Sequence, residues 1–218
     1  MTSTDYIRLE SEYGAHNYHP IPVVLSKGLG VHVWDVEGKK YLDFLSAYSA
    51  VNQGHCHHRL IQAISVQAQK LTLSSRAFHN DQLGQTEKKL AEKFGYDKVL
   101  LMNTGVEAGE SAIKLARKWA YEVKGIPNNQ AQIIVAEGNF WGRTIAAISS
   151  STDPSSYHHF GPYAPGFIKI PYNDLASLEA QVKDPNVAAF MVEPIQGEAG
   201  VVLPDAGYLK KASELCKK

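Results

Sequence analysis

Short apolar segments alternate with helix-forming segments from Val99 to the end of the 218-residue chain, and this alternation most constrains the fold. The apolar segments, four to six residues long, read as strands at 99–102, 132–136, 167–171 and 187–192. The intervening segments have helical periodicity at about 106–124, 142–149, 174–182 and 206–217. Alternating strands and helices are typical of parallel sheets with flanking helices. The sequence therefore predicts an α/β fold.

The first third of the chain has a different pattern. Residues 30–34 and 41–45 alternate around a turn at 35–39, which predicts a β-hairpin in a small N-terminal lobe. Amphipathic helices are expected at 59–71 and 81–94.

The composition of the chain limits the classes of partner that it is expected to bind. Twenty-two basic residues balance twenty-two acidic ones, so nothing favours nucleic acid or an anionic membrane, and small molecules are the expected partners. Cys56 and Cys216 are too few for a disulfide framework and read as reduced thiols. No apolar run approaches a membrane span and the start lacks signal-peptide features, so the expected location is cytoplasmic.

The stretch Asn103–Arg117 passes from a Thr-Gly turn directly into a helix-forming segment. The first helical turn has amide groups without intrahelical partners and carries partial positive charge, so a phosphate can bind there, and Gly105 allows close approach. Thr104 and Glu107 also fit a capping box, which would stabilise a helix that binds nothing. The residues alone leave both interpretations open.

Two further stretches follow predicted strands, where functional groups gather in open α/β sheets. In the first, Phe140 or Trp141 could stack on a flat ligand and Arg143 could hold a carboxylate, although this stretch taken alone favours a packed aromatic beside a surface arginine. In the second, Glu193 and Glu198 could steer a cationic group or simply be solvated.

The sequence Gly54-His-Cys-His-His58 looks like a metal site, but adjacent side chains cannot all reach one ion. No distant Cys/His cluster completes the set, so no metal is expected.

The order and wording of these stretches resemble the class III pyridoxal-phosphate aminotransferases of fold type I. The resemblance runs from about Tyr13 to the final lysine. It is carried by Gly14-Ala-His-Asn-Tyr-His-Pro20, Val33-Trp-Asp-Val-Glu-Gly38, Ser49-Ala-Val-Asn-Gln-Gly-His55, Thr-Gly-Val-Glu-Ala, Phe-Trp-Gly-Arg-Thr and Glu-Pro-Ile-Gln-Gly-Glu. Trp141 favours the ornithine branch, because acetylornithine and related ω-amino acid enzymes usually carry histidine there. His58 departs from the proline that the family has after Gly-His-x-His.

The resemblance implies roles for these residues around pyridoxal 5'-phosphate. Gly105 and Val106 would give backbone N–H groups to the phosphate, Thr104 would cap the turn, and Phe140 would stack on the pyridine ring. Glu193 would lie near that ring.

The resemblance also implies a substrate site. Tyr18 and Arg143 would hold the α-carboxylate of ornithine so that the δ-amino group reaches the cofactor. Tyr48 would line the pocket, as would Trp141 beside the cofactor. Glu198 resembles the carboxylate that masks a second substrate-binding arginine.

By the same resemblance, these residues correspond to an N-terminal portion of the fold: residues 1–60 an N-terminal segment with the hairpin, residues 61–218 an incomplete cofactor-binding large domain. The aspartate that pairs with the pyridinium nitrogen and the Schiff-base lysine find no match here, so we expect no catalytic residue among these 218 and no activity from them alone. The strand expected at 99–102 would lack its usual partner.

The reaction implied is transfer of the δ-amino group of L-ornithine to 2-oxoglutarate, giving glutamate 5-semialdehyde and glutamate, in a homodimer when full length. Two alternatives remain: another class III enzyme, such as an acetylornithine aminotransferase, or a non-catalytic fragment that pairs with a full-length subunit.

Overall fold

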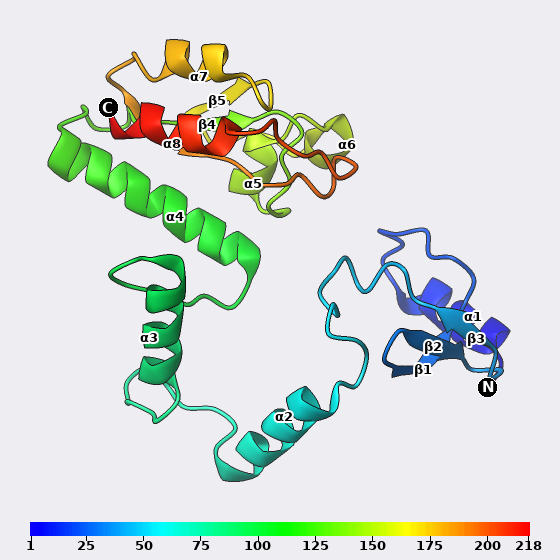
Figure 1. The fold of residues 1–218 in the computed structure, drawn as a ribbon. Helices are drawn as coiled ribbons and strands as arrows, with labels where there is room; N and C mark the ends of the chain where they lie inside the picture. The colour runs from blue at the N-terminus through cyan, green and yellow to red at the C-terminus, as the bar shows by residue number, and fades with distance from the viewer. The chain divides into compact units, whose positions relative to one another are not determined.

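Two groups of elements, residues Met1–Thr86 and Glu87–Lys218, form separate units in the computed structural model, which describes the whole of residues 1–218. Figure 1 shows the chain from its N-terminus to its C-terminus. The predicted domain division after residue 60 stays a prediction; the units divide after Thr86.

The first unit contains a small antiparallel sheet of β1 (Leu25–Leu29), β2 (His32–Asp35) and β3 (Lys40–Leu42), in that order. The predicted hairpin is confirmed as β2 and β3, whereas β1 was not predicted. Asp35 organises the hairpin turn: its carboxylate accepts the N–H of Glu37 at 3.1 Å, the N–H of Lys39 at 2.8 Å and the hydroxyl of Tyr41 at 2.6 Å. Hydrogen bonds to one carboxylate therefore hold the residues of this turn together.

Helices precede and follow this sheet along the chain. The helix α1 (Ser3–Tyr13) was not predicted, and it begins with a capping box of Thr2 and Asp5. The helices α2 (His58–Lys70) and α3 (Leu83–Phe94) confirm the two amphipathic helices expected from periodicity. Neither α2 nor α3 has a buried residue. The apolar face of α2 is exposed at Leu60, Ile61 and Ile64, whereas Leu83 and Leu90 of α3 are partly buried.

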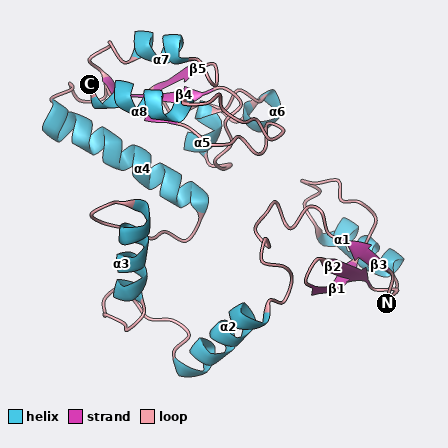
Figure 2. Ribbon diagram, in the orientation of Figure 1, coloured by secondary structure: helices cyan, strands magenta, loops and turns pink.

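The second unit is built on a parallel sheet in the order β5-β4-β6, with β4 (Gln132–Ala136) between β5 (Phe167–Ile170) and β6 (Val187–Met191). Helices lie on both sides of this sheet, as Figure 2 shows, which confirms the predicted α/β architecture with a mainly parallel sheet. No helix of the chain combines the length and apolar character that crossing a membrane requires.

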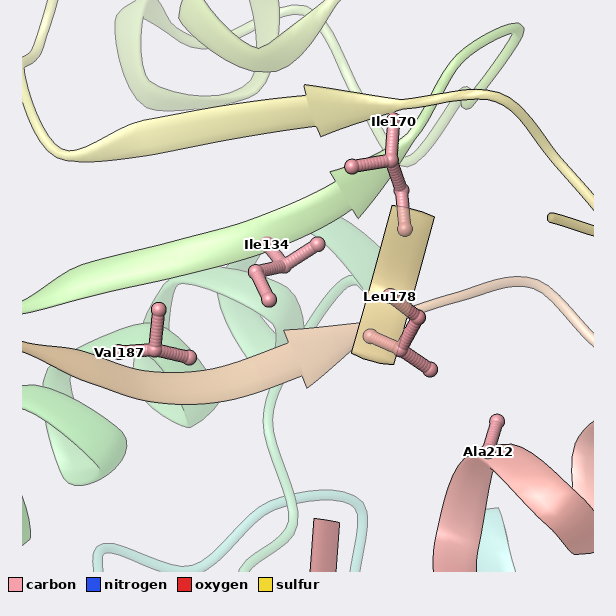
Figure 3. Close-up of a cluster of buried hydrophobic side chains, with 5 residues drawn as sticks. All are labelled: Ile134, Ile170, Leu178, Val187 and Ala212. Atoms are coloured by element: carbon pink, nitrogen blue, oxygen red, sulfur yellow. The ribbon is translucent and has the colours of Figure 1, made fainter. Parts of the chain in front are cut away.

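One face of the sheet packs against α7 (Leu175–Gln181) and α8 (Tyr208–Lys217). The core of this face, drawn in Figure 3, consists of Ile134, Ile170, Leu178, Val187 and Ala212. The other face packs against α4 (Gly105–Trp119), whose Ile113 contacts a cluster with Ile133 and Val135. Alternate residues of β4 therefore point to opposite faces, as expected for a strand buried on both sides.

The long helix predicted at about 106–124 is present but changes character near its end. After α4 the chain forms a π-helical turn, η1 (Ala120–Lys124), which ends at Gly125 in the left-handed conformation with φ 80°. A glycine at this position terminates a helix without a Cβ penalty.

The predicted strand at 99–102 is wrong, because these residues form no strand. Leu100, Leu101 and Met102 are exposed, and no strand runs beside them to share backbone hydrogen bonds. An apolar run without a pairing partner cannot form a ladder.

The remaining helices are α5 (Ile145–Ser150) and α6 (Pro154–Tyr157). The predicted helix at 142–149 begins three residues late, at Ile145, because Thr144 is its N-cap and accepts the N–H of Ala147 at 3.3 Å. The short α6 was not predicted.

Candidate active site

The turn at the start of α4 has the capping box that is one of the two interpretations of its sequence. The Thr104 hydroxyl accepts the N–H of Glu107 at 3.2 Å, and the Glu107 carboxylate accepts the N–H of Thr104 at 3.1 Å and of Asn103 at 2.8 Å. The capping box is therefore present. It satisfies the third amide of the helix and leaves the N–H groups of Gly105 and Val106, the first two helical residues, without a partner in the helix.

The space beside Gly105 is open. A Cβ placed on Gly105 would have no atom of the chain within 4 Å, so the packing of the protein itself does not require glycine there. Two backbone N–H groups at a helix start, beside an open backbone, can donate hydrogen bonds to a phosphate oxygen. The geometry of this turn is therefore compatible with a bound phosphate in addition to the capping box.

The loop after β4, residues 138–144, lies against the first turns of α4. A Cβ on Gly142, whose φ is 149°, would stand 2.3 Å from Val106 Cγ2, and a Cβ on Gly109 would stand 2.7 Å from Trp141 Cε3. Both glycines allow the loop and the helix to approach closely. The structure thereby brings together the loop at residues 138–144, here the aromatic loop, and the turn at residues 104–106, here the phosphate turn.

Trp141 is held by polar groups that sequence reasoning missed. Its indole N–H donates to the Ser150 hydroxyl at 2.8 Å, and Ser150 is completely buried. The Asn139 side chain donates to the carbonyls of Ala136 at 2.7 Å and Ser150 at 2.9 Å. Asn139 directly precedes the Phe-Trp-Gly-Arg-Thr motif, but nothing in the sequence marks Ser150.

Phe140 and Arg143 stand on the same loop. The Phe140 N–H donates to Glu193 Oε1 at 2.9 Å, which ties this loop to the segment after β6. The Arg143 guanidinium carbon lies 5.6 Å from the centre of the Phe140 ring, a distance at which a cation and an aromatic face attract each other.

The segment after β6 reaches the same place from the other side. The Gln196 amide donates to the Glu137 carbonyl at 2.7 Å, and Tyr172 donates its hydroxyl to the Glu193 carbonyl at 3.2 Å. Burial, with the nearby Glu193 carboxylate, raises the pKa of the Tyr172 phenol, which keeps it a donor. Glu198 is exposed on this segment.

A small pocket of about 50 Å³ lies between these loops at the carboxyl ends of β4 and β6. Trp141, Asn139 and Glu193 line it together with the strand residues Val135 and Met191 and with Val192, which follows β6. The second unit therefore gathers the predicted phosphate turn, the aromatic loop and Glu193 at the carboxyl end of its sheet, whereas Glu198 is exposed on the segment after β6.

Tyr18 and Tyr48 belong to the first unit. Tyr18 lines a hollow of about 880 Å³ formed by residues between Tyr6 and Leu25. Tyr48 is 75% exposed and stands in a turn at residues 46–49.

Three lysines of the second unit are engaged in structural bonds or exposed. Lys169 donates to the Ser151 carbonyl at 2.6 Å, and Lys124 donates to the Val187 carbonyl at 2.6 Å. Lys114 is exposed on α4. None of these contacts resembles a lysine presented to a ligand.

Comparisons with known proteins identify what the chain is similar to. The sequence model of the class III aminotransferase family matches residues 13–218. A probable mitochondrial ornithine aminotransferase of Caenorhabditis elegans is 64% identical over 218 residues, which cover 100% of this chain and 52% of that protein. The chain spans about half the length of the curated relatives that it matches.

Solved structures agree with the sequence relatives. The ornithine aminotransferase of Toxoplasma gondii superposes with a TM-score of 0.97 at 56% identity, covering 100% of this chain and 51% of that one. The acetylornithine aminotransferase of Elizabethkingia anophelis superposes with a TM-score of 0.84, also at 56% identity, covering 100% of this chain and 51% of that one.

Proposed function

This chain belongs to the class III aminotransferases, and from that premise we propose that the protein transfers the δ-amino group of L-ornithine to 2-oxoglutarate. The products would be glutamate 5-semialdehyde and glutamate. The observation that carries the proposal is the close approach of Gly142 to Val106, which sets the aromatic loop beside two unpartnered amides of α4. Ornithine aminotransferases of high identity among the relatives support the choice of substrate.

Pyridoxal 5'-phosphate is the cofactor that we propose for this site. The N–H groups of Gly105 and Val106 would hold its phosphate, with Thr104 fixing the turn, and the open space at Gly105 fits such a group. Phe140 would stack on its ring and Glu193 would lie near it. The bound cofactor would supply an electron-accepting ring for amino-group transfer.

The substrate contacts follow from the same proposal. Arg143 offers a forked cation for the α-carboxylate of ornithine, and Tyr18 would be its second anchor. Anchoring the α-carboxylate selects the distant δ-amino group for reaction, because position decides which amine is reached. Tyr48 and Trp141 would line the pocket, and Glu198 would mask a second arginine during the first half-reaction.

Steady-state kinetics of the protein purified from its natural source test the substrate. We expect ornithine turnover well above that of N-acetylornithine. In Arg143→Gln the ornithine KM should rise about tenfold or more, because a charge-assisted pair is lost. Arg59→Gln, which changes an exposed arginine on α2, is the matched control and should leave KM unchanged.

An acetylornithine aminotransferase is the second candidate, favoured by the 56% identity to the Elizabethkingia anophelis structure. Comparable turnover of both substrates, or an unchanged ornithine KM in Arg143→Gln and Tyr18→Phe, would favour it. Replacing Trp141 with histidine separates the two further. If Trp141 favours ornithine, Trp141→His shifts the ratio of the two kcat/KM values toward N-acetylornithine.

The catalytic lysine and the homodimer are part of the proposal. We expect the lysine outside these 218 residues, either further along a longer chain or on a second chain. Borohydride reduction with pyridoxal phosphate, followed by peptide mapping, tests this expectation. One stoichiometric adduct on a lysine of residues 1–218 contradicts it, whereas scattered weak labelling of these lysines is expected from a non-catalytic fragment.

The cytoplasm is the compartment that we propose, supported by two cysteines that form no disulfide. The printed name of the Caenorhabditis elegans relative places that protein in mitochondria. Fractionation of cells of the natural source decides between them, and recovery of the protein with mitochondria would overturn the proposal.

A further inference from the structure

The turn that presents Tyr48 has an unusual backbone. Ser46, Ala47, Tyr48 and Ser49 have φ values of 49°, 49°, 54° and 67°, so four consecutive residues with side chains adopt the left-handed conformation. In this conformation Cβ crowds the following carbonyl oxygen, and residues other than glycine usually adopt it singly. Something outside the turn must therefore hold it.

Asp43 is bound to the start of this turn. One oxygen of its carboxylate, Oδ1, accepts the N–H of Leu45 at 3.0 Å and the N–H of Ser46 at 2.8 Å. Its other oxygen, Oδ2, lies 2.7 Å from His55 Nε2. An ionised carboxylate only accepts, so His55 Nε2 carries the proton and donates it. These hydrogen bonds, that from His55 first, hold the pKa of Asp43 below its ordinary value and keep the carboxylate charged.

His55 is in turn fixed by the first strand. Its backbone exchanges two hydrogen bonds with Gly30, at 2.9 and 2.8 Å. A Cβ on Gly28 in β1 would stand 2.7 Å from His55 Cγ, so the imidazole packs directly on the bare backbone of that strand. The ring therefore has little freedom to leave Asp43.

We propose that Asp43 and His55 form a positioning pair that holds residues 46–49 in the left-handed turn and thereby fixes where Tyr48 stands. The inference rests on the proposed function in one respect, that Tyr48 lines the substrate pocket. His55 does not contact the substrate. It acts through Asp43, and Asp43 acts through the backbone of the turn.

Hydrogen exchange of the natural protein, measured by mass spectrometry, tests the holding of the turn without any activity. In His55→Leu, peptides covering residues 44–51 should exchange at least about fivefold faster, because Asp43 loses its anchor. His55→Gln can still donate from its Nε2 and should stay within twofold of the unchanged protein. His58→Leu is the matched control: His58 is exposed in the same motif, stacks on His57 and has no bond to Asp43. Should His55→Leu fail to fold, His55→Asn, whose amide is shorter, is measured in the same way.

Kinetics test the consequence for Tyr48. His55→Leu should raise the ornithine KM several-fold with a smaller change in kcat. In a double-mutant cycle, the effect of His55→Leu on KM should largely disappear once Tyr48 is alanine, since a positioning residue has no effect without the residue it positions. A general structural role would instead give additive effects.

The outcomes separate the two proposals. Unchanged exchange in His55→Leu overturns the positioning pair whatever the activity. Faster exchange with additive KM effects overturns its action through Tyr48. If Tyr48→Ala alone leaves KM unchanged for every substrate, the pocket role of Tyr48 in the proposed function fails, while the exchange data still decide whether the pair holds the turn.

Discussion

The loop at residues 138–144 and the turn at residues 46–49 both carry aromatic side chains of the proposed site, but they are held by different means. The loop sits between the end of a buried sheet and α4, and buried groups such as Ser150 and Gln196 hold it by hydrogen bonds to it and to neighbouring residues. The turn is exposed at Ala47, Tyr48 and Ser49, and one carboxylate anchors its start. Packing spreads the task of positioning over many contacts, whereas a strained surface turn concentrates it on a few polar groups.

The largest effect is expected where the loop meets the helix. In Gly142→Ala the new methyl group would lie 2.3 Å from Val106 Cγ2, and the residue would keep a φ of 149° that disfavours a side chain. The clash and the backbone strain together should cost roughly 2–4 kcal/mol of stability. The loop and the phosphate turn would also separate. Thermal unfolding and the pyridoxal phosphate dissociation constant of the natural protein measure both effects, and the constant should rise about tenfold or more.

Gly84→Ala is the control for this change. A Cβ on Gly84 meets no atom within 4 Å, and the residue lies inside α3, so alanine should be neutral or stabilising by up to about 1 kcal/mol. If Gly142→Ala binds the cofactor as tightly as the unchanged protein, the contact between loop and helix does not shape the phosphate site.

Ser150→Ala should have the next largest effect. It removes the buried acceptor of the Trp141 indole N–H and leaves that donor unsatisfied, at a cost of about 1–3 kcal/mol. Chemical denaturation measures the free energy of unfolding, and the tryptophan emission should shift as the ring loses its fixed environment. Ser213→Ala, an exposed position on α8, should stay within about 0.5 kcal/mol. Equal effects of the two changes would show that the hydrogen bond to Ser150 does not hold Trp141.

Sequence reasoning found most of the second unit because its signals are local. The strands β4, β5 and β6 are short, mainly apolar runs, and the helices that follow them have clear periodicity. The segment 99–102 carried the same signal and failed, because a strand also needs a partner that no local pattern reveals. The strand β1, with its Ser-Lys-Gly interior, shows no alternation and was missed for the converse reason.

The motifs of the candidate site could be predicted from the sequence, but the residues and turn that hold them in place could not. The motifs containing Thr104, Phe140 and Glu193 were recognisable, and the structure brings them together at one edge of the sheet. Ser150 lies several residues beyond the Phe-Trp-Gly-Arg-Thr motif, and it meets Trp141 only because the fold brings the two residues together. The left-handed turn was invisible, since its sequence Ser-Ala-Tyr-Ser contains neither glycine nor asparagine, the residues that usually mark positive φ.

The smallest predicted effect gives the sharpest comparison, because one substitution should change sign between two places. Ala47→Gly removes the Cβ from a residue at φ 49° and should raise the free energy of unfolding by about 1 kcal/mol. Ala63→Gly makes the same change in the interior of α2, where glycine should lower it by roughly 0.5–1 kcal/mol. Ala47 and Ala63 are both exposed, so burial does not separate them.

Chemical denaturation of the natural protein compares the two variants. A lower stability in both would mean that the left-handed turn carries no side-chain strain, and the need for Asp43 and His55 to hold it would disappear. Opposite signs would mean that the turn keeps alanine at a cost to stability. In that case the extra freedom of Ala47→Gly should also loosen Tyr48, so the ornithine KM should rise about twofold even as the protein becomes more stable.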